Sequence, residues 1–176
     1  MTDPALLRWL APTAALVAAP ACATTYFTLE QAQALMFPGQ TLTALPVKLS
    51  AAQAREIGQR SDTRVRQREL QVWRAENGGW FYLDQVIGKH EFITYGVAIS
   101  ADGAVEALEI LDYRETYGGE VRNPKWRQQF VGKRVDAPLK LDVDIINLSG
   151  ATLSSRNIAT GIKRLLATHE LVVSKL

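Results

Sequence analysis

Four consecutive segments in the middle of the chain have the composition and the turn spacing of β-strands, and side chains alternate along the first of them. The four segments are 69–75, 80–87, 92–100 and 105–113. The connections are short: Asn77-Gly78-Gly79 supplies a tight turn between the first two, and Asp102-Gly103 between the last two. Because a parallel pair of strands needs a long crossover, strands joined in this way run antiparallel. The pattern therefore predicts an antiparallel meander sheet.

Helices are predicted before and after this block of strands. Capping-box signatures, in which a hydroxyl residue is followed three positions later by a glutamine, begin at Thr28 and at Ser50. Apolar side chains at helical spacing indicate a further helix near the C-terminus. The predicted helices are 29–36, about 51–60, 124–130 and about 153–168, and residues 139–146 are expected to be extended. The fold class is therefore α+β, with helices flanking an antiparallel meander sheet.

The first 23 residues differ from the rest of the chain. Arg8 precedes an uncharged apolar run that is too short to anchor the chain in a bilayer. The run closes on Ala21-Cys22-Ala23, which places small residues at the positions that a signal peptidase reads. We predict a cleavable export signal over residues 1–23 and a single mature domain over residues 24–176, located in the periplasm. A buried N-terminal helix and lipid attachment at Cys22 remain as alternatives.

The amino-acid composition excludes several classes of function. The formal net charge is +2, which argues against a nucleic-acid partner. The one cysteine, Cys22, lies in the predicted signal, so a mature domain has no disulfide, thiol nucleophile or iron–sulfur ligand. The two histidines, His90 and His169, are far apart and have no acidic cluster beside them, so neither a metal site nor a serine–histidine–acid triad is expected. Function must come from oxygen nucleophiles, backbone groups or a bound cofactor.

The most informative motif is Ser149-Gly150-Ala151-Thr152, directly before the last predicted helix. Gly150 permits a tight turn and Ala151 keeps the turn free of bulk. The hydroxyls of Thr152, Ser154 and Ser155 surround the first helical turn. Free backbone N–H groups and the positive end of the helix dipole make such a turn a phosphate site. The alternative is an ordinary Ser/Gly N-cap, which is common ahead of any helix.

Ser-Gly-Ala-Thr before a helix resembles the flavinylation motif of the FMN-binding domain family, which includes the C subunit of the sodium-translocating NADH:quinone reductase and the G subunit of the Rnf complex. The resemblance implies that Thr152 carries FMN through a phosphoester, installed from FAD by a flavin transferase. Residues 149–151 then shape the phosphate turn. Asp144 matches the acidic residue that the family carries before the motif, although it lies five residues ahead of Ser149. The resemblance covers about residues 80–168.

A loop after the last predicted strand carries the same resemblance. Residues 113–120 are similar to the Glu-Thr-x-Gly loop that packs against the flavin ring in this family. The resemblance implies that Glu115, Thr116 and Gly118 lie beside the ring, with Gly118 allowing close backbone approach. Lys89, after the second strand, either faces the phosphate or the flavin or is a solvated lysine. A plain Gly-Gly turn is the alternative interpretation of the loop.

These features predict an exported flavoprotein with covalent FMN that exchanges electrons with a membrane or periplasmic partner. It is not expected to be a stand-alone catalyst, because no site for a hydride donor is recognisable. The alternative function is a non-redox binding or assembly module of the same fold that holds FMN loosely or not at all. A basic stretch is interpreted as solvated surface, or as a docking face for an acidic redox partner or anionic lipids. Its members are Arg55, Arg60, Arg64, Arg66, Arg68 and Arg74.

Overall fold

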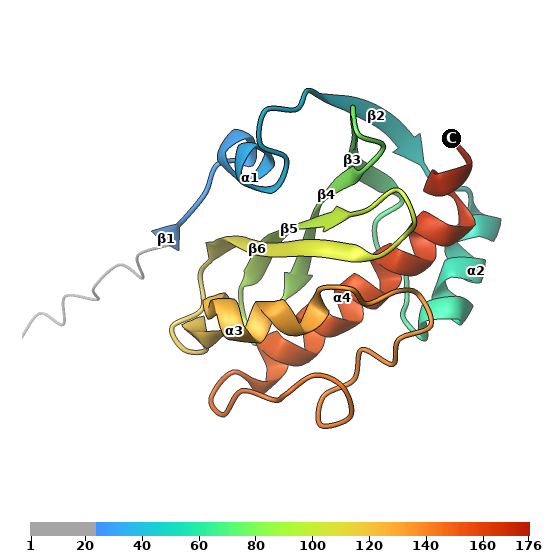
Figure 1. Ribbon diagram of the computed structural model, residues 1–176. Coiled ribbons are helices and arrows are strands. Elements are labelled where there is room, and N and C mark those ends of the chain that lie inside the picture. The colour runs from blue at the N-terminus through green and yellow to red at the C-terminus, as the bar shows by residue number, and fades with distance from the viewer. Residues whose placement is uncertain (1–23) are drawn as a thin grey trace, which may run out of the picture.

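The computed structural model describes residues 24–176, so the predicted export signal over residues 1–23 lies outside the described residues. The described chain forms a six-stranded antiparallel sheet with the strand order β1-β6-β5-β4-β3-β2 (Figure 1). The strands are β1 (Thr24–Thr25), β2 (Leu42–Lys48), β3 (Glu69–Ala75), β4 (Trp80–Ile87), β5 (Phe92–Ile99) and β6 (Val105–Tyr113). The predicted α+β class and the antiparallel meander from β3 to β6 are confirmed.

The helices follow the predicted order along the chain. They are α1 (Leu29–Met36), α2 (Ala51–Ser61), α3 (Pro124–Arg127) and α4 (Thr152–Leu171), with short 3₁₀ turns at Gly119–Arg122, Gln128–Phe130 and Val173–Lys175. Both predicted capping boxes form: the Thr28 Oγ1 atom accepts from Gln31 N, and the Ser50 Oγ atom accepts from Gln53 N. α4 is longer than predicted, because it begins one residue earlier and ends three residues later. Within residues 24–176, no helix combines the length and the apolar character that a membrane span requires.

Helices cover both faces of the sheet. Since side chains alternate across a strand, Phe81 and Ala98 face one side while Tyr82 and Val97 face the other. The first pair packs with the α1 region in a small cluster, and the second belongs to a larger core that includes residues of α2 and α4. Figure 1 shows α4 running across the sheet, with α2 beside its C-terminal half. The N-terminal end of α4 is thereby placed next to the loops at one end of the central strands.

Two strands were not predicted from the sequence. β2 pairs along its whole length with β3, and Pro46 lies opposite Gln71 in this pairing. Proline cannot donate to a strand ladder, but β2 is an edge strand with one free side, where proline is tolerated. β1 is a two-residue strand that pairs with the end of β6 and forms the other edge.

The prediction of an extended segment over residues 139–146 is wrong, because these residues form a compact turn. Leu139 and Asp142 adopt left-handed backbone conformations, with φ of 47° and 62°. The Asp144 carboxylate holds the turn by accepting from the backbone N–H groups of Leu139 (3.2 Å) and Lys140 (2.8 Å), and it pairs with Lys133 Nζ at 2.9 Å. Burial alone would raise the pKa of Asp144, yet these backbone hydrogen bonds and Lys133 hold that pKa below its usual value.

Candidate functional site

The N-terminus of α4 lacks the side-chain cap that α1 and α2 both have. Its N-cap residue is Ala151, which offers no hydrogen-bonding side chain, so the ordinary Ser/Gly N-cap is not formed. The first backbone bond of the helix runs from Ser155 N to Ala151 O at 2.8 Å. In the described part of the chain, no protein acceptor meets the N–H groups of Thr152, Leu153 and Ser154. These three donors are open to a ligand or to solvent.

The turn before α4 is shaped by glycine. Gly150 has a φ of +83°, a left-handed conformation that side chains rarely adopt, and no atom lies within 4 Å of the position where its Cβ would be. Ala151 N donates to Leu148 O at 2.9 Å and closes the turn. Ala151 itself is buried, whereas Ser149 is exposed on the outside of the turn. A small and tightly turned backbone therefore presents Thr152, the first residue of α4, beside open space.

An open pocket of about 530 Å³ lies at this helix terminus. Three segments that are distant in the sequence meet around it: the β4–β5 turn, the loop after β6 and the first turn of α4. The lining residues are Lys89, His90, Glu115, Thr116, Tyr117, Gly150, Ala151, Thr152, Leu153 and Ser154. The volume is within the usual range for small-molecule sites. We refer to this pocket as the α4 terminal pocket.

The α4 terminal pocket gathers six of the nine residues that sequence reasoning assigned to a cofactor site. These six are Lys89, Glu115, Thr116, Gly150, Ala151 and Thr152. Gly118 does not line the pocket but packs behind it, against Ala151. Ser149 is exposed outside the lining, and Ser155 is fully buried beneath it. Sequence reasoning placed Ser154 among the hydroxyls of the first helical turn without assigning it to the cofactor, and it gave no site role to His90, Tyr117 and Leu153.

Glu115 organises one wall of the pocket through its carboxylate. The Oε1 atom accepts from the backbone N–H groups of His90 (2.6 Å) and Glu91 (3.0 Å), and thereby fixes the turn that carries Lys89. Burial alone would raise the pKa of Glu115, but these backbone donors hold that pKa below its usual value. The carboxylate is thus charged at neutral pH and committed to the protein backbone. The turn can approach so closely because residue 88 is a glycine.

Tyr113 joins the loop after β6 to the start of α4. Its buried hydroxyl donates to Tyr117 O at 2.6 Å and lies 3.1 Å from the Ser154 Oγ atom. Burial raises the pKa of Tyr113, so the hydroxyl keeps its proton near neutral pH and remains a donor. Gly118 has a φ of +91°, and a Cβ at this position would lie 2.5 Å from the Tyr113 hydroxyl and 3.1 Å from the Ala151 Cβ atom. The predicted ring loop and the predicted phosphate turn are therefore in direct contact.

Thr152 is the hydroxyl of the helix start that suits a covalent attachment best. Ser154 lines the pocket, but its Oγ atom is buried and occupied by Tyr113, and Ser155 has no exposed surface. The side chain of Thr152 is only partly buried and has no hydrogen-bond partner in the described part of the chain. Four buried side-chain atoms in residues 24–176 lack a partner, and two of them, Asn147 Oδ1 and Ser155 Oγ, flank the Ser149–Thr152 motif. The three free N–H groups at the start of α4, with Lys89 lining the same pocket, fit a phosphate-bearing ligand.

Metal ligands do not gather at this site. Residues 24–176 contain no group of three or more histidine, cysteine, aspartate or glutamate side chains placed to hold a metal ion. His90 lies at the α4 terminal pocket, whereas His169 is buried near the other end of α4. The His169 Nδ1 atom pairs with the Tyr82 hydroxyl at 2.8 Å, and burial lowers the pKa of His169 to about 4.

The fold and the site define an α+β ligand-binding domain whose pocket opens on an uncapped helix N-terminus. Residues 88–167 match the family model of the FMN-binding domain. The matched segment runs from the β4–β5 turn through most of α4 and includes every residue that lines the α4 terminal pocket. FMN is therefore the cofactor of this domain class.

Curated relatives match the same region. The C subunit of the Na⁺-translocating NADH-quinone reductase of Vibrio alginolyticus is 37% identical over 79 residues, covering 35% of this chain and 31% of that protein. Its counterpart in Yersinia pestis is also 37% identical over 79 residues, covering 30% of that protein. The match thus spans about a third of the length of these relatives.

Proposed function

We propose that this chain is an electron-transfer flavoprotein in which the Thr152 hydroxyl carries FMN through a phosphoester. The observation that carries the proposal is the contrast between the helices. Two long helices are closed by capping boxes, while α4 leaves three N–H groups free beside the Thr152 hydroxyl and Lys89. Donors, a cation and an accessible nucleophile around one point are what a phosphate ester requires.

Thr152 acts in maturation and not in turnover. Its hydroxyl attacks the flavin-side phosphorus of FAD, the new Thr152 Oγ1–P bond replaces the pyrophosphate bond, and AMP leaves as the hydroxyl proton is lost. A flavin transferase supplies the activation, because no general base lies within hydrogen-bond distance of Thr152 in the described residues. The free N–H groups at the start of α4 and the Lys89 ammonium then stabilise the phosphodiester.

The walls of the pocket hold the rest of the cofactor. Thr116 and Tyr117 line the pocket together with Lys89 and His90, and the hydrogen bonds of Glu115 and Tyr113 fix the two loops that carry these residues. When bound, FMN supplies one- and two-electron redox chemistry through its isoalloxazine ring. We propose that the partner is a membrane or periplasmic redox protein, which agrees with the names of the curated relatives as subunits of an NADH-quinone reductase. An exported location rests on residues 1–23 of the sequence.

Co-expression with a flavin transferase tests the proposal. The wild-type chain should gain the mass of one FMN less water, and its band should fluoresce in a denaturing gel, where a non-covalent flavin is lost. Thr152→Val keeps the shape and the β-branch but removes the nucleophilic oxygen, so it should fold and stay dark. Thr152→Ser should retain part of the label, because a primary hydroxyl still attacks phosphorus.

Ser149→Ala is the matched control, since Ser149 lies in the motif but outside the pocket, and its band should remain fluorescent. A fluorescent Thr152→Val band would show that another hydroxyl is the attachment point. A dark wild-type band in the presence of an active transferase would contradict the covalent linkage. In that case a colourless native preparation would indicate the non-redox module, and a yellow one would indicate loosely bound FMN.

A further inference from the structure

A second pocket, of about 500 Å³, lies along the middle of α4. It is enclosed by the α2–β3 connection, the end of β4, the start of β5 and the α4 residues from Asn157 to Arg164. Thr160, which lines it, is eight residues beyond Thr152, or about 12 Å along the helix at 1.5 Å per residue. We refer to it as the α4 central pocket.

The α4 central pocket is separate from the α4 terminal pocket. The two sets of lining residues have no member in common. A side-chain contact divides them. The Asn157 Nδ2 atom donates to Ile87 O at 2.7 Å and reaches Gly88 O at 3.4 Å. These hydrogen bonds connect α4 to the end of β4 between the two pockets. The two pockets are therefore lined by different residues on either side of this contact.

The charge of the α4 central pocket is positive. Arg64 and Arg66 line it from the α2–β3 connection, and neither has an ion-pair partner among the described residues. Arg164 lines it from α4. Asp84 is the only acidic residue in the lining, and it is already paired with Arg164 Nη2 at 2.6 Å. Two guanidinium groups are therefore left without a counter-charge at this pocket.

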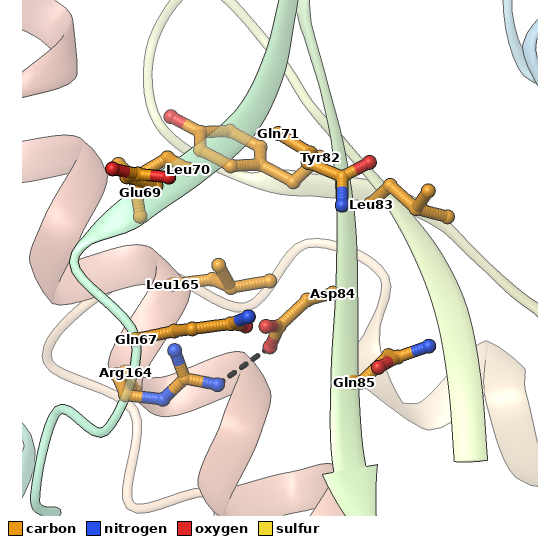
Figure 2. Close-up of a pocket in the computed structure, with 10 residues that line it drawn as sticks. All are labelled: Gln67, Glu69, Leu70, Gln71, Tyr82, Leu83, Asp84, Gln85, Arg164 and Leu165. Carbon is orange, nitrogen blue, oxygen red and sulfur yellow. Dashed lines mark hydrogen bonds and ion pairs between the residues drawn. The ribbon is translucent and has the colours of Figure 1, made fainter. Parts of the chain in front are cut away.

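One wall of the pocket is held rigid by a buried network. Figure 2 shows Arg164 of α4 reaching Asp84 of β4, with Gln67 alongside. The buried Tyr95 hydroxyl donates to the same Asp84 Oδ2 atom. Tyr95 can reach this atom because residue 161 of α4 is a glycine, and a Cβ there would collide with the tyrosine hydroxyl. The Arg164 guanidinium is thus held by Asp84, which leaves Arg64 and Arg66 as the cations available to a ligand.

Part of the pocket lining is apolar and exposed. Ile87 and Phe92 line the pocket and remain 42% and 57% exposed, although large apolar side chains gain free energy when they are covered. Two unpaired arginines next to two exposed apolar side chains match a molecule with a flat apolar body and an acidic end.

We propose that the α4 central pocket binds a small aromatic anion, with its acidic group on Arg64 and Arg66 and its ring on Ile87 and Phe92. Binding of naphthalene-2-sulfonate to the full-length chain, followed by titration calorimetry, tests this proposal. The neutral naphthalene-2-sulfonamide has the same ring and isolates the contribution of charge. The sulfonate should bind in a 1:1 ratio and at least tenfold more tightly than the sulfonamide.

Variants locate the site. Replacing Arg64 and Arg66 together by Gln should remove the tenfold preference, because both positions are exposed and the change leaves the core intact. Arg55→Gln is the matched control, since Arg55 is an exposed arginine of α2 outside this pocket, and it should keep the preference. Thr160→Trp should fill the pocket and abolish binding of both compounds, whereas Thr152→Val should leave binding unchanged.

Equal affinity for the two compounds, or equal loss of the preference with Arg55→Gln, would overturn the proposal. So would binding that survives Thr160→Trp in a folded variant. The outcome is independent of the covalent flavin, because the flavin-free chain and the Thr152→Val variant are both expected to bind the sulfonate.

Discussion

Gly88 and Glu115 lie so close together that a Cβ atom at position 88 would come within 2.5 Å of the Glu115 Oε1 atom. That oxygen accepts both backbone hydrogen bonds that fix the β4–β5 turn. Because residue 88 has no side chain, the Glu115 carboxylate from the loop after β6 can come close enough to stabilise the β4–β5 turn. Sequence reasoning placed Glu115 beside the flavin ring and gave no structural role to Gly88.

Gly88→Ala should push the Glu115 carboxylate away from the backbone N–H groups of His90 and Glu91. A lost hydrogen bond to a charged group costs about 1.5–3 kcal/mol, and the free energy of unfolding should fall by that order in urea denaturation. Gly119→Ala is the control, because no atom lies within 4 Å of its Cβ position, and its effect should stay within about 0.5 kcal/mol. Equal losses from both substitutions would show that Glu115 does not hold the turn.

Gly118→Ala should disturb the loop after β6 and the turn before α4 together. The added Cβ would press on the Tyr113 hydroxyl and on Ala151, next to Thr152, the proposed attachment point. Sequence reasoning assigned Gly118 to the flavin ring and residues 149–151 to the phosphate turn, as two separate segments. From the structure we expect a lower yield of covalent flavin as well as an altered flavin spectrum.

Gly132→Ala is the control for Gly118→Ala, because it introduces backbone strain without a contact to Tyr113 or Ala151. Gly132 also has a positive φ, of 78°, but nothing lies within 4 Å of its Cβ position. It should cost stability through strain while leaving the flavin yield and spectrum unchanged. If Gly118→Ala behaves in the same way as Gly132→Ala, the contact with Ala151 has no part in the site.

His169 should make the stability of the protein depend on pH between about 6.5 and 4. Burial lowers the pKa of His169 to about 4 in the folded protein, so the unfolded chain binds the proton first as the pH falls. Stability is therefore lost on acidification through this range, by about 3 kcal/mol at pH 4. The free energy of unfolding, measured by urea titration at several pH values, should fall less steeply for His169→Gln. His90→Gln should keep the wild-type slope, and a wild-type slope in His169→Gln would contradict the assignment.

The exported protein should begin at Thr24. Ala21 and Ala23 occupy the positions that a signal peptidase reads, and in the structure Thr24 and Thr25 already pair with Tyr113 and Asp112 at the edge of the sheet. N-terminal sequencing of periplasmic material measures this directly. An intact Met1, or a lipid on Cys22, would contradict the prediction.

Local sequence patterns were sufficient to predict the helices and strands that depend on a single motif. The capping boxes at Thr28 and Ser50 located α1 and α2, and the glycine turns located the strands from β3 to β6. β2 was missed because its partner is supplied by tertiary pairing and because Pro46 argues against a strand unless the strand is at an edge. Residues 139–146 were assigned as extended because their apolar content outweighed the Asp144 turn, which depends on Lys133 from another segment.

In the candidate site, too, motifs predicted some residues, and others could be recognised only in the folded chain. Thr152, Gly150 and Glu115 were found through motifs, because each stands in a short run of recognisable composition. Tyr113 was missed as a site residue, since it belongs to a strand and only the folded chain brings its hydroxyl to Ser154. The sequence also could not indicate that the Glu115 carboxylate accepts from backbone N–H groups, because these donors belong to a turn that lies 24 and 25 residues away in the chain.

If Thr152 carries FMN as proposed, the uncapped start of α4 would link maturation to degradation of the protein. A helix whose first N–H groups have no protein partner frays more easily, and a phosphate ester on Thr152 would supply the missing acceptors. The chain without its flavin should therefore open more often at this end than the finished protein. Because proteolysis acts on such opened forms, copies that fail to receive the cofactor would be degraded first. One alanine, Ala151, would in this way let the cell distinguish finished from unfinished molecules.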